Sequence, residues 1–299
     1  MASPQDLAEL IERYADGDGV HETALPRVAL IRSSSPTEPL HALHQPALCI
    51  VAQGRKQVML GAEIFLYDAA EFLVVSVDLP VVGEVVEASP ERPYLCFRLD
   101  LDPASLGAML VEFGLDGAPD DDRPHPGLTL GPVTPDLLDA AVRLVRLLGS
   151  PKDAKALAPL AEREILYRLA SGGLAKTLRQ IAMADGRLGQ VNRAIGWIKR
   201  NFREPFRMEE VCSEARMSQS ALHAHFRTVT AMSPLQYQKQ LRLQEARRLI
   251  LSRAADAAGA GHAVGYDSPS QFSREYRRMF GAPPMRDADR LRAQPIGAN

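Results

Sequence analysis

The chain has 299 residues, of which 46% are hydrophobic and 24% are charged, as is usual for a globular protein and not for a disordered or fibrous one. No apolar run approaches the roughly 18 residues of a membrane span, and the N-terminus lacks the basic and apolar regions of a secretory signal. We therefore expect a cytoplasmic protein with no membrane association. Its three cysteines are far apart in the sequence, which argues against a disulfide framework and favours free thiols.

The length is sufficient for two domains, and the charge is distributed as if there were two. Residues 1–187 carry 17 basic and 27 acidic side chains, a net charge of −10, whereas residues 188–299 carry 18 and 10, a net charge of +8. A basic module joined to an acidic one favours a polyanionic partner for the basic part, most often nucleic acid.

From about Pro26 to Leu101 the chain consists of short apolar or alternating runs, which predict strands. Glycines and prolines separate these runs at the spacing of a small antiparallel barrel or sandwich. Gln53-Gly54-Arg55-Lys56 predicts a hairpin turn with two solvated charges, in preference to an anion site. The runs themselves are ALCIVAQ, KQVMLG, EIFLYD, EFLVVSV and YLCFRLDLD.

Two helices are predicted to follow the strands, the second from about Asp153 to Ala170. The first carries an apolar stripe at three- and four-residue spacing, and such a stripe needs a partner surface. We predict that it forms a homodimer; the alternatives are packing against the protein's own barrel, or both at once. The stripe consists of Leu137, Leu138, Ala141, Leu144, Val145 and Leu148.

The segment FRMEEVCSEARMSQSALHAHFRT, residues 206–228, has the spacing of a helix-turn-helix unit. Ser218 is placed to cap the second helix, and Leu222 with Phe226 forms a buried pair four residues apart. Cys212 lies at a small inward position of the first helix and is predicted to be structural.

A second unit of the same kind begins at Ala254. Ser268-Pro269 opens its second helix, because proline is tolerated in a first turn where its missing N–H costs nothing. The second helices of the two units begin 50 residues apart. Between the units, a long helix predicted to begin at Ser233-Pro234 sets their spacing.

The segments MSPLQYQKQLRLQEARRLI and VGYDSPSQFSREYRRMFGAPPMRD resemble the DNA-binding domain of the AraC/XylS family over about residues 190–292. PALCIVAQGRKQVMLG, SVDLPVVGEV and ASPERPYL resemble the N-terminal domain of one AraC-type subgroup. Arg216 and Ala231 depart from the family, which usually has glycine at these two positions.

The resemblance implies an α+β protein of two domains. Residues 1–175 would form a cupin-like β-barrel with dimerisation helices, residues 176–190 a linker, and residues 191–292 an all-α domain with two helix-turn-helix units. It also implies a transcriptional regulator whose partners are double-stranded promoter DNA and a small-molecule effector of unknown identity, with RNA polymerase as a further candidate.

The outward face of each second helix should contact DNA in the major groove. Arg274 is the strongest candidate, because a guanidinium can bond guanine bidentately; the alternative is a solvated arginine paired along its helix. Arg227, Arg277 and Arg278 are expected to contact phosphates or to solvate the helix. The remaining candidates are Gln219, Ser220, His223 and Ala224 in the first unit and Ser270, Gln271 and Ser273 in the second.

Candidate ligand-binding residues of the barrel are Cys49, Tyr94, Cys96 and Arg98, although buried cysteines are more often inert. His41 and His44 lack a third convincing ligand, so we predict no metal and no cofactor. No catalytic motif is present, and an enzyme is not expected. Two alternatives stay open, a cupin-type enzyme fused to a DNA-binding domain and a barrel that serves only for dimerisation.

Overall fold

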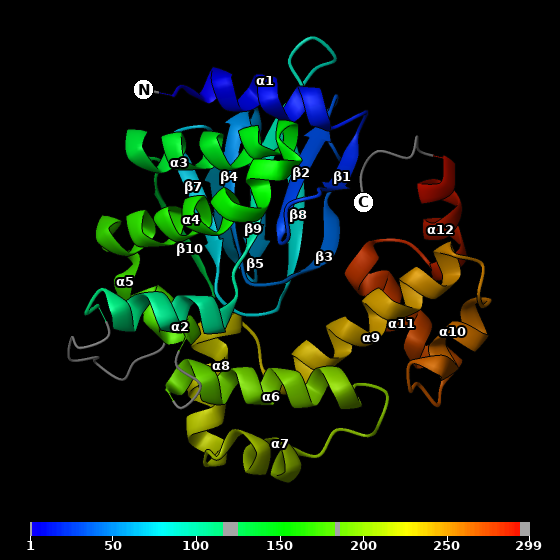
Figure 1. The fold of residues 1–299 in the computed structure, drawn as a ribbon. Coiled ribbons are helices and arrows are strands. Elements are labelled where there is room, and N and C mark those ends of the chain that lie inside the picture. Colours follow the sequence, from blue (N-terminus) through cyan, green and yellow to red (C-terminus); the bar gives the residue numbers. More distant parts are fainter. Residues whose placement is uncertain (1, 116–124, 183–185, 294–299) are drawn as a thin grey trace. The chain divides into compact units, whose positions relative to one another are not determined.

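The computed structural model describes residues 2–115, 125–182 and 186–293 (Figure 1). The chain forms two compact units, and the boundary between them falls between Gly189 and Gln190. This boundary lies close to the position at which the sequence changes from net acidic to net basic. The N-terminal unit contains all the strands of the described chain, and the C-terminal unit is helical.

A six-stranded antiparallel sheet forms one wall of the N-terminal unit. Residues of β9 alternate between its two faces, so that Leu95, Phe97 and Leu99 lie on one face and Tyr94 and Cys96 on the other, all of them buried. In spatial order the strands are β1 (Gly19–Glu22), β2 (Val28–Ser33), β9 (Tyr94–Asp100), β4 (Ala47–Gln53), β7 (Glu71–Val75) and β10 (Leu128–Pro132).

A four-stranded antiparallel sheet forms the other wall. Its strands, in spatial order, are β3 (Leu40–His44), β8 (Leu79–Glu87), β5 (Arg55–Leu60) and β6 (Glu63–Tyr67). Within the described residues no strand pairing joins the two sheets, so the predicted barrel is an open one. The strand-rich N-terminal domain predicted from the sequence is confirmed.

Helix α1 (Pro4–Tyr14) lies across the outer face of the six-stranded sheet, against β2, β4 and β9 (Figure 1). It begins with a capping box, in which Ser3 and Asp6 satisfy backbone N–H groups reciprocally, and it buries Leu7 and Ile11 completely. Helices α3 (Pro135–Arg146) and α4 (Pro151–Leu169) form the next layer, with α3 packed against both α1 and α4.

The apolar stripe that the sequence assigned to a dimer is part of this core. Leu137, Leu138, Ala141, Leu144 and Val145 each expose 6% or less of their surface within the single chain, and Leu148 is half-buried in the turn after α3. A side chain buried in its own chain is not available to a partner. The predicted dimer surface is thus buried within its own unit, where α3 packs against α1 and α4.

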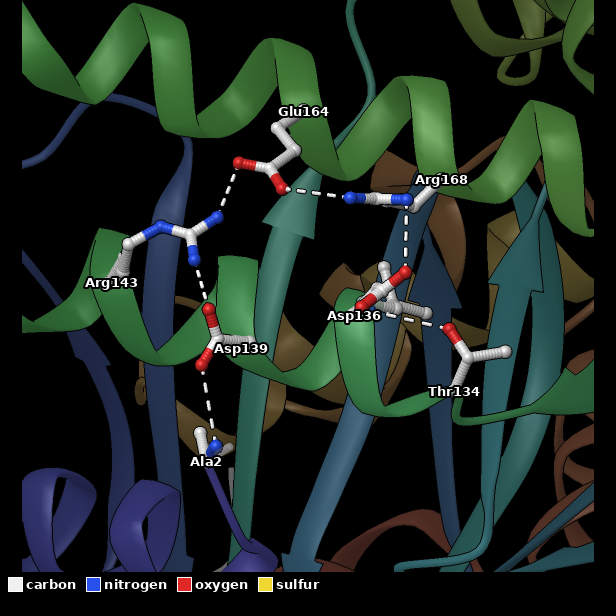
Figure 2. Close-up of polar contacts among 8 residues, drawn as sticks. Ala2, Thr134, Asp136, Asp139, Arg143, Glu164 and Arg168 are labelled. Atoms are coloured by element: carbon white, nitrogen blue, oxygen red, sulfur yellow. Dashed lines mark hydrogen bonds and ion pairs between the residues drawn. The ribbon is translucent and has the colours of Figure 1, made fainter.

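Charged side chains join α3 to α4 (Figure 2). Arg143 pairs with Asp139 of its own helix and with Glu164 of α4. Arg168 of α4 pairs with Asp136 at 2.9 Å and with Glu164 at 3.5 Å. All five side chains are at least one-third exposed, so each pair adds little stability and the network serves mainly to align the two helices.

The segment predicted as a linker is largely helical. Helix α5 (Ala175–Ala182) packs against α2 (Pro103–Glu112) and buries Leu178 and Ile181. Residues 183–185 of the predicted linker lie outside the described residues. The N-terminal unit therefore extends through α5, beyond the domain end predicted at residue 175.

The C-terminal unit is built from seven helices of the described chain, and the two predicted helix-turn-helix units are present. In these helices the apolar residues Val211, Leu222, Phe226, Phe272 and Tyr276 are all buried. No helix in the described ranges has both the length and the hydrophobicity of a membrane-spanning segment. The helices are α6 (Arg187–Asn201), α7 (Met208–Ala215), α8 (Gln219–Thr230), α9 (Pro234–Leu251), α10 (Ala257–Ala263), α11 (Pro269–Phe280) and α12 (Pro284–Ala293).

Candidate nucleic-acid interface and barrel interior

Helices α7 and α8 form the first helix-turn-helix unit. Ser218 caps α8 as predicted, because its side chain accepts a hydrogen bond from the backbone N–H of Ala221 at 3.4 Å. Leu222 and Phe226 are fully buried, and the Phe226 ring packs edge-to-face on Tyr237 of α9 with ring centroids 5.5 Å apart. These contacts fix which side of α8 faces outward.

The outward side of α8 carries the residues predicted to contact DNA. Ser220 lies next to the cap, its hydroxyl 3.3 Å from that of Ser218. His223 is half-buried, whereas the other candidates are exposed, namely Gln219, Ser220, Ala224 and Arg227. This face is short and mostly uncharged, so it offers few groups that can discriminate between bases.

Helices α10 and α11 form the second helix-turn-helix unit, in which two glycines allow close packing against neighbouring segments. A Cβ atom at Gly261 would lie 2.9 Å from the Phe272 ring, and Gly265 has a positive φ of 88° with the Arg203 carbonyl only 2.0 Å from a would-be Cβ. Any larger residue at either position would displace its neighbour. Ser268 caps α11 by accepting the Gln271 backbone N–H at 3.3 Å.

All the predicted readers on α11 are exposed, namely Ser270, Gln271, Ser273, Arg274 and Arg278. They differ in what they already bind. The Gln271 amide donates to Glu275 one turn later at 3.2 Å, and Glu275 also accepts from Lys239 and Tyr266. Within the described residues Arg274 makes no ion pair, so its guanidinium is available to an external acceptor. The alternative of an arginine paired along its helix is not what the structure shows.

Helix α9 connects the two helix-turn-helix units of the C-terminal unit, and Arg242 of α9 is hydrogen-bonded to the backbone beside both. Its guanidinium donates to the carbonyls of Phe202 and Glu204, before α7, and to that of Gly265, in the turn of the second unit, at 2.5, 2.7 and 2.8 Å. Sequence reasoning missed this residue, because an arginine inside a basic helix carries no local sign of its partners. Arg242 therefore helps to set the spacing of α8 and α11.

Two residues that depart from the resembled family occupy left-handed backbone positions. Arg216 ends α7 with φ 53°, and Ala231 ends α8 with φ 58°. The left-handed region favours glycine at the residue after a helix, because a Cβ there is crowded by backbone. The usual glycine of the family thus has a physical reason at both positions.

Replacing Ala231 with glycine is therefore expected to stabilise the C-terminal unit by about 1 kcal/mol, since the left-handed conformation costs a residue with a Cβ about 1–2 kcal/mol. Ala224→Gly, the same change inside α8, should instead destabilise it by about 1 kcal/mol. Urea unfolding of both variants measures the difference, and equal effects at the two positions would contradict the explanation.

The four predicted ligand-binding residues of the barrel lie together on one face of β4 and β9. Tyr94, Cys96 and Arg98 alternate along β9, and Cys49 of β4 lies directly opposite Arg98. Tyr67, from the four-stranded sheet, interacts with Cys49, Tyr94 and Cys96, so this face points into the space between the sheets. Arg98 also pairs with Glu22 at 3.1 Å and with Asp100 at 3.0 Å.

Protonation within this cluster is strongly perturbed. The interaction between the Cys49 and Cys96 thiols raises the pKa of Cys49 well above its usual range and lowers the pKa of Cys96. Burial raises the pKa of Tyr67 and of Tyr94 well above the usual range. Cys49, Tyr67 and Tyr94 are therefore held in their neutral forms at neutral pH.

Lys56 and His44 also belong to the inner face, and the position of Lys56 differs from the sequence-based expectation. Lys56 was predicted to be solvated in a turn, but it lies in β5 with its Cε atom 3.4 Å from the position of a Cβ on Gly83. Burial lowers the pKa of His44 to about 3, and the charges of Lys56 and Arg98 act in the same direction. In the ranges that the structure describes, no three His, Cys, Asp or Glu side chains are grouped as a metal centre.

The profile of the AraC-type transcriptional regulator N-terminus matches residues 24–177, and a helix-turn-helix domain profile matches residues 211–290. The HTH-type transcriptional regulator ArgR of Pseudomonas aeruginosa is 26% identical over 153 residues, 50% of this chain and 45% of that protein. The HTH-type transcriptional activator RhaS of Salmonella schwarzengrund is 26% identical over 155 residues, 51% of this chain and 54% of that protein. The chain thus spans about half the length of the curated relatives it matches.

Solved structures of ToxT from Vibrio cholerae share the fold. One superposes with a TM-score of 0.58 and 10% identity, covering 92% of this chain and 100% of that one. Another, at 1.65 Å resolution, also gives 0.58 and 10%, covering 88% and 97%. At this identity the likeness concerns the fold alone, whereas the N-terminal profile covers half of the chain. The chain therefore belongs to the family of AraC-type transcriptional regulators.

Proposed function

We propose that this chain is a DNA-binding transcriptional regulator whose C-terminal unit binds promoter DNA through α8 and α11, and whose barrel responds to a small molecule. One observation carries the proposal: the capped helices α8 and α11, both with exposed polar faces, lie together in the C-terminal unit. Helix α9 connects them, and its Arg242 is hydrogen-bonded to the backbone beside each helix-turn-helix unit. The same unit has the positive charge of the chain. Paired helices of this kind are suited to successive major grooves.

The direct test is DNA binding by the full chain and by residues 188–299, which contain both units and the net charge of +8. Both proteins should bind duplex DNA, with an affinity that falls steeply as salt increases, because phosphate contacts release counterions. A fragment that is folded by circular dichroism and shows no DNA affinity at low salt would defeat the proposal. Operator sequences can then be selected from a random duplex pool.

Arg274 and Arg278 provide a matched pair for the role of α11. Arg274→Ala is expected to weaken operator binding about 5- to 150-fold, corresponding to about 1–3 kcal/mol, and to relax the preference at one base pair. Arg278→Ala, one turn later, should weaken all sequences about equally, as expected for a phosphate contact. The measurement is the affinity of each variant for the operator and for its single-base variants. Uniform weakening by Arg274→Ala would reassign this residue to the phosphate backbone.

We further propose that the effector is acidic and binds the inner face formed by Cys49, Tyr94, Cys96 and Arg98. ToxT structures contain an unsaturated fatty acid or (E)-4-(8-methylnaphthalen-1-yl)but-3-enoic acid. In this chain, Lys56 and Arg98 are cations on the inner face and suit a carboxylate. A rise in melting temperature with carboxylic acids, and none with their alcohols, would support this class. No shift with any metabolite would favour a barrel used only for dimerisation.

For a homodimer, we propose the outer face of α4 in place of the α3 stripe. Leu157 and Leu160 lie one turn apart on α4 and expose 47% and 62% of their surface. Large apolar side chains that are exposed together are a common feature of interfaces. We assign no surface to RNA polymerase, which stays a candidate partner. The alternative of a cupin-type enzyme needs a catalytic activity of the isolated barrel that no group in this site suggests.

A further inference from the structure

Two buried thiols lie on one face of the six-stranded sheet, on the adjacent strands β4 and β9. Cys49 of β4 lies opposite Arg98, and Cys96 of β9 lies opposite Val51, so the two cysteines are diagonal neighbours on one face of adjacent strands. Cys49 exposes 6% of its surface and Cys96 1%. The Cys96 sulfur also contacts the Phe97 carbonyl at 3.5 Å. The pair is a preassembled set of two soft ligands.

The diagonal register disfavours a disulfide between Cys49 and Cys96. Diagonal neighbours on antiparallel strands lie about 7–8 Å apart, whereas a disulfide requires Cα atoms about 4.4–6.8 Å apart. A direct bond between the sulfurs would therefore require movement of two central strands. A metal ion bound between the two sulfurs would require much less movement of the strands.

The number of available ligands limits which metal ion the two sulfurs can bind. No third His, Cys, Asp or Glu side chain joins the pair within the described residues. Zinc takes four ligands in structural sites, and calcium and magnesium take six or more oxygen atoms. Thiolates select soft ions, and among these Cu(I) can be bound by two ligands in a linear arrangement. A buried pair of thiols without further ligands therefore fits Cu(I) best.

Charge supports the same choice. Cu(I) with two thiolates has a net charge of −1, which is costly in a buried site without a counter-charge. The positive charge of Lys56 acts on both thiols. Among the residues that the structure describes, Lys56 has no carboxylate within ion-pair distance, whereas Arg98 is paired with Glu22 and Asp100. Lys56 is thus the available cation to offset this charge.

We propose that Cys49 and Cys96 bind one Cu(I) ion as a two-coordinate bis-thiolate inside the barrel. Binding breaks both S–H bonds, forms two S–Cu bonds and releases two protons to solvent, with no change in oxidation state. The site is distinct from a centre at His41 and His44, which the sequence argues against. Copper and the acidic effector are alternative occupants of this face, because both use the charge of Lys56. Copper binding is measured directly, so its failure leaves the DNA-binding function and the effector proposal unaffected.

The test is titration of the full reduced chain with Cu(I) under anaerobic conditions, in competition with bicinchoninate. The unmodified chain and Cys212→Ser, which removes the third cysteine, should bind one ion per chain. Cys49→Ala and Cys96→Ala should each lose at least about 100-fold in affinity, since one of two ligands is gone. Lys56→Met should lose about 10-fold, whereas Arg55→Met, at the neighbouring position paired with Asp68 at 3.2 Å, should lose none.

X-ray absorption of the copper-loaded unmodified chain keeps the proposal testable if a cysteine variant does not fold. Two sulfur neighbours and no nitrogen are expected. Three or more ligands, or copper that depends on Cys212, would overturn the proposal. So would a chain that loses 2 Da on exposure to copper and retains none, because the pair would then be a disulfide-forming redox couple.

Discussion

Asp287→Ala is expected to lower the free energy of unfolding of the C-terminal unit by about 3–5 kcal/mol. Asp287 has no exposed surface and accepts two hydrogen bonds from Arg247, at 2.8 Å from Nε and 2.9 Å from Nη2, and one from the Tyr276 hydroxyl at 2.9 Å. The Arg247 side chain is only 10% exposed. Removing the carboxylate would leave this guanidinium buried without its partner, which costs more than the pair contributes.

Denaturant unfolding measures the loss, with Asp289→Ala as the control. Asp289 lies two residues away, is 72% exposed and pairs with Arg292 at 3.6 Å, so its removal should change stability by less than about 0.5 kcal/mol. The double variant Arg247→Met with Asp287→Leu should recover most of the loss, because both charges are then gone. Equal effects of Asp287→Ala and Asp289→Ala would contradict this explanation, because the Arg247 guanidinium would then not be left buried without a partner.

The same pair predicts a pH dependence. Burial raises the pKa of Asp287, but the hydrogen bonds and charge of Arg247 outweigh it and hold the pKa below its usual value. A carboxyl group with a lowered pKa in the folded state stabilises the fold fully above its unfolded pKa of about 3.9. This stability is lost as the pH falls through the folded pKa. The gap in stability between the unmodified chain and Asp287→Ala should therefore narrow below about pH 4.

Leu144→Asp is expected to unfold the N-terminal unit, with a loss of about 4–5 kcal/mol or more. Leu144 exposes 1% of its surface, on α3 and facing the core. An aspartate there would be a buried charge without a partner. Leu160→Asp is the matched control, because it makes the same change at a side chain that is 62% exposed on α4.

Thermal unfolding and sedimentation distinguish the two surfaces. Leu144→Asp should lose its cooperative transition, whereas Leu160→Asp should keep the melting temperature and, on the proposed α4 interface, convert dimers to monomers. A well-folded monomer from Leu144→Asp would restore the α3 stripe as the interface and contradict the core assignment.

Most of the DNA-binding unit was predictable because its signals are local. The serines at 218, 233 and 268 cap helices as expected, and all three satisfy a backbone N–H within the next three residues. Helix period and capping depend on neighbours a few residues away, so the sequence alone contains them. The change of net charge near residue 188 likewise indicated the boundary between the units.

The tertiary structure alone decided which distant residues meet. Asp287 and Arg247 are 40 residues apart, and nothing in either neighbourhood indicates their pairing. The stripe on α3 was recognisable as apolar, but whether it faces a partner or its own core depends on α1 and α4. By itself, the sequence determined the helix starts, the turn spacing and the strand-rich start of this chain. Register and packing placed Cys49 beside Cys96 and Lys56 inside the barrel, because strand pairing joins residues that are far apart in the chain.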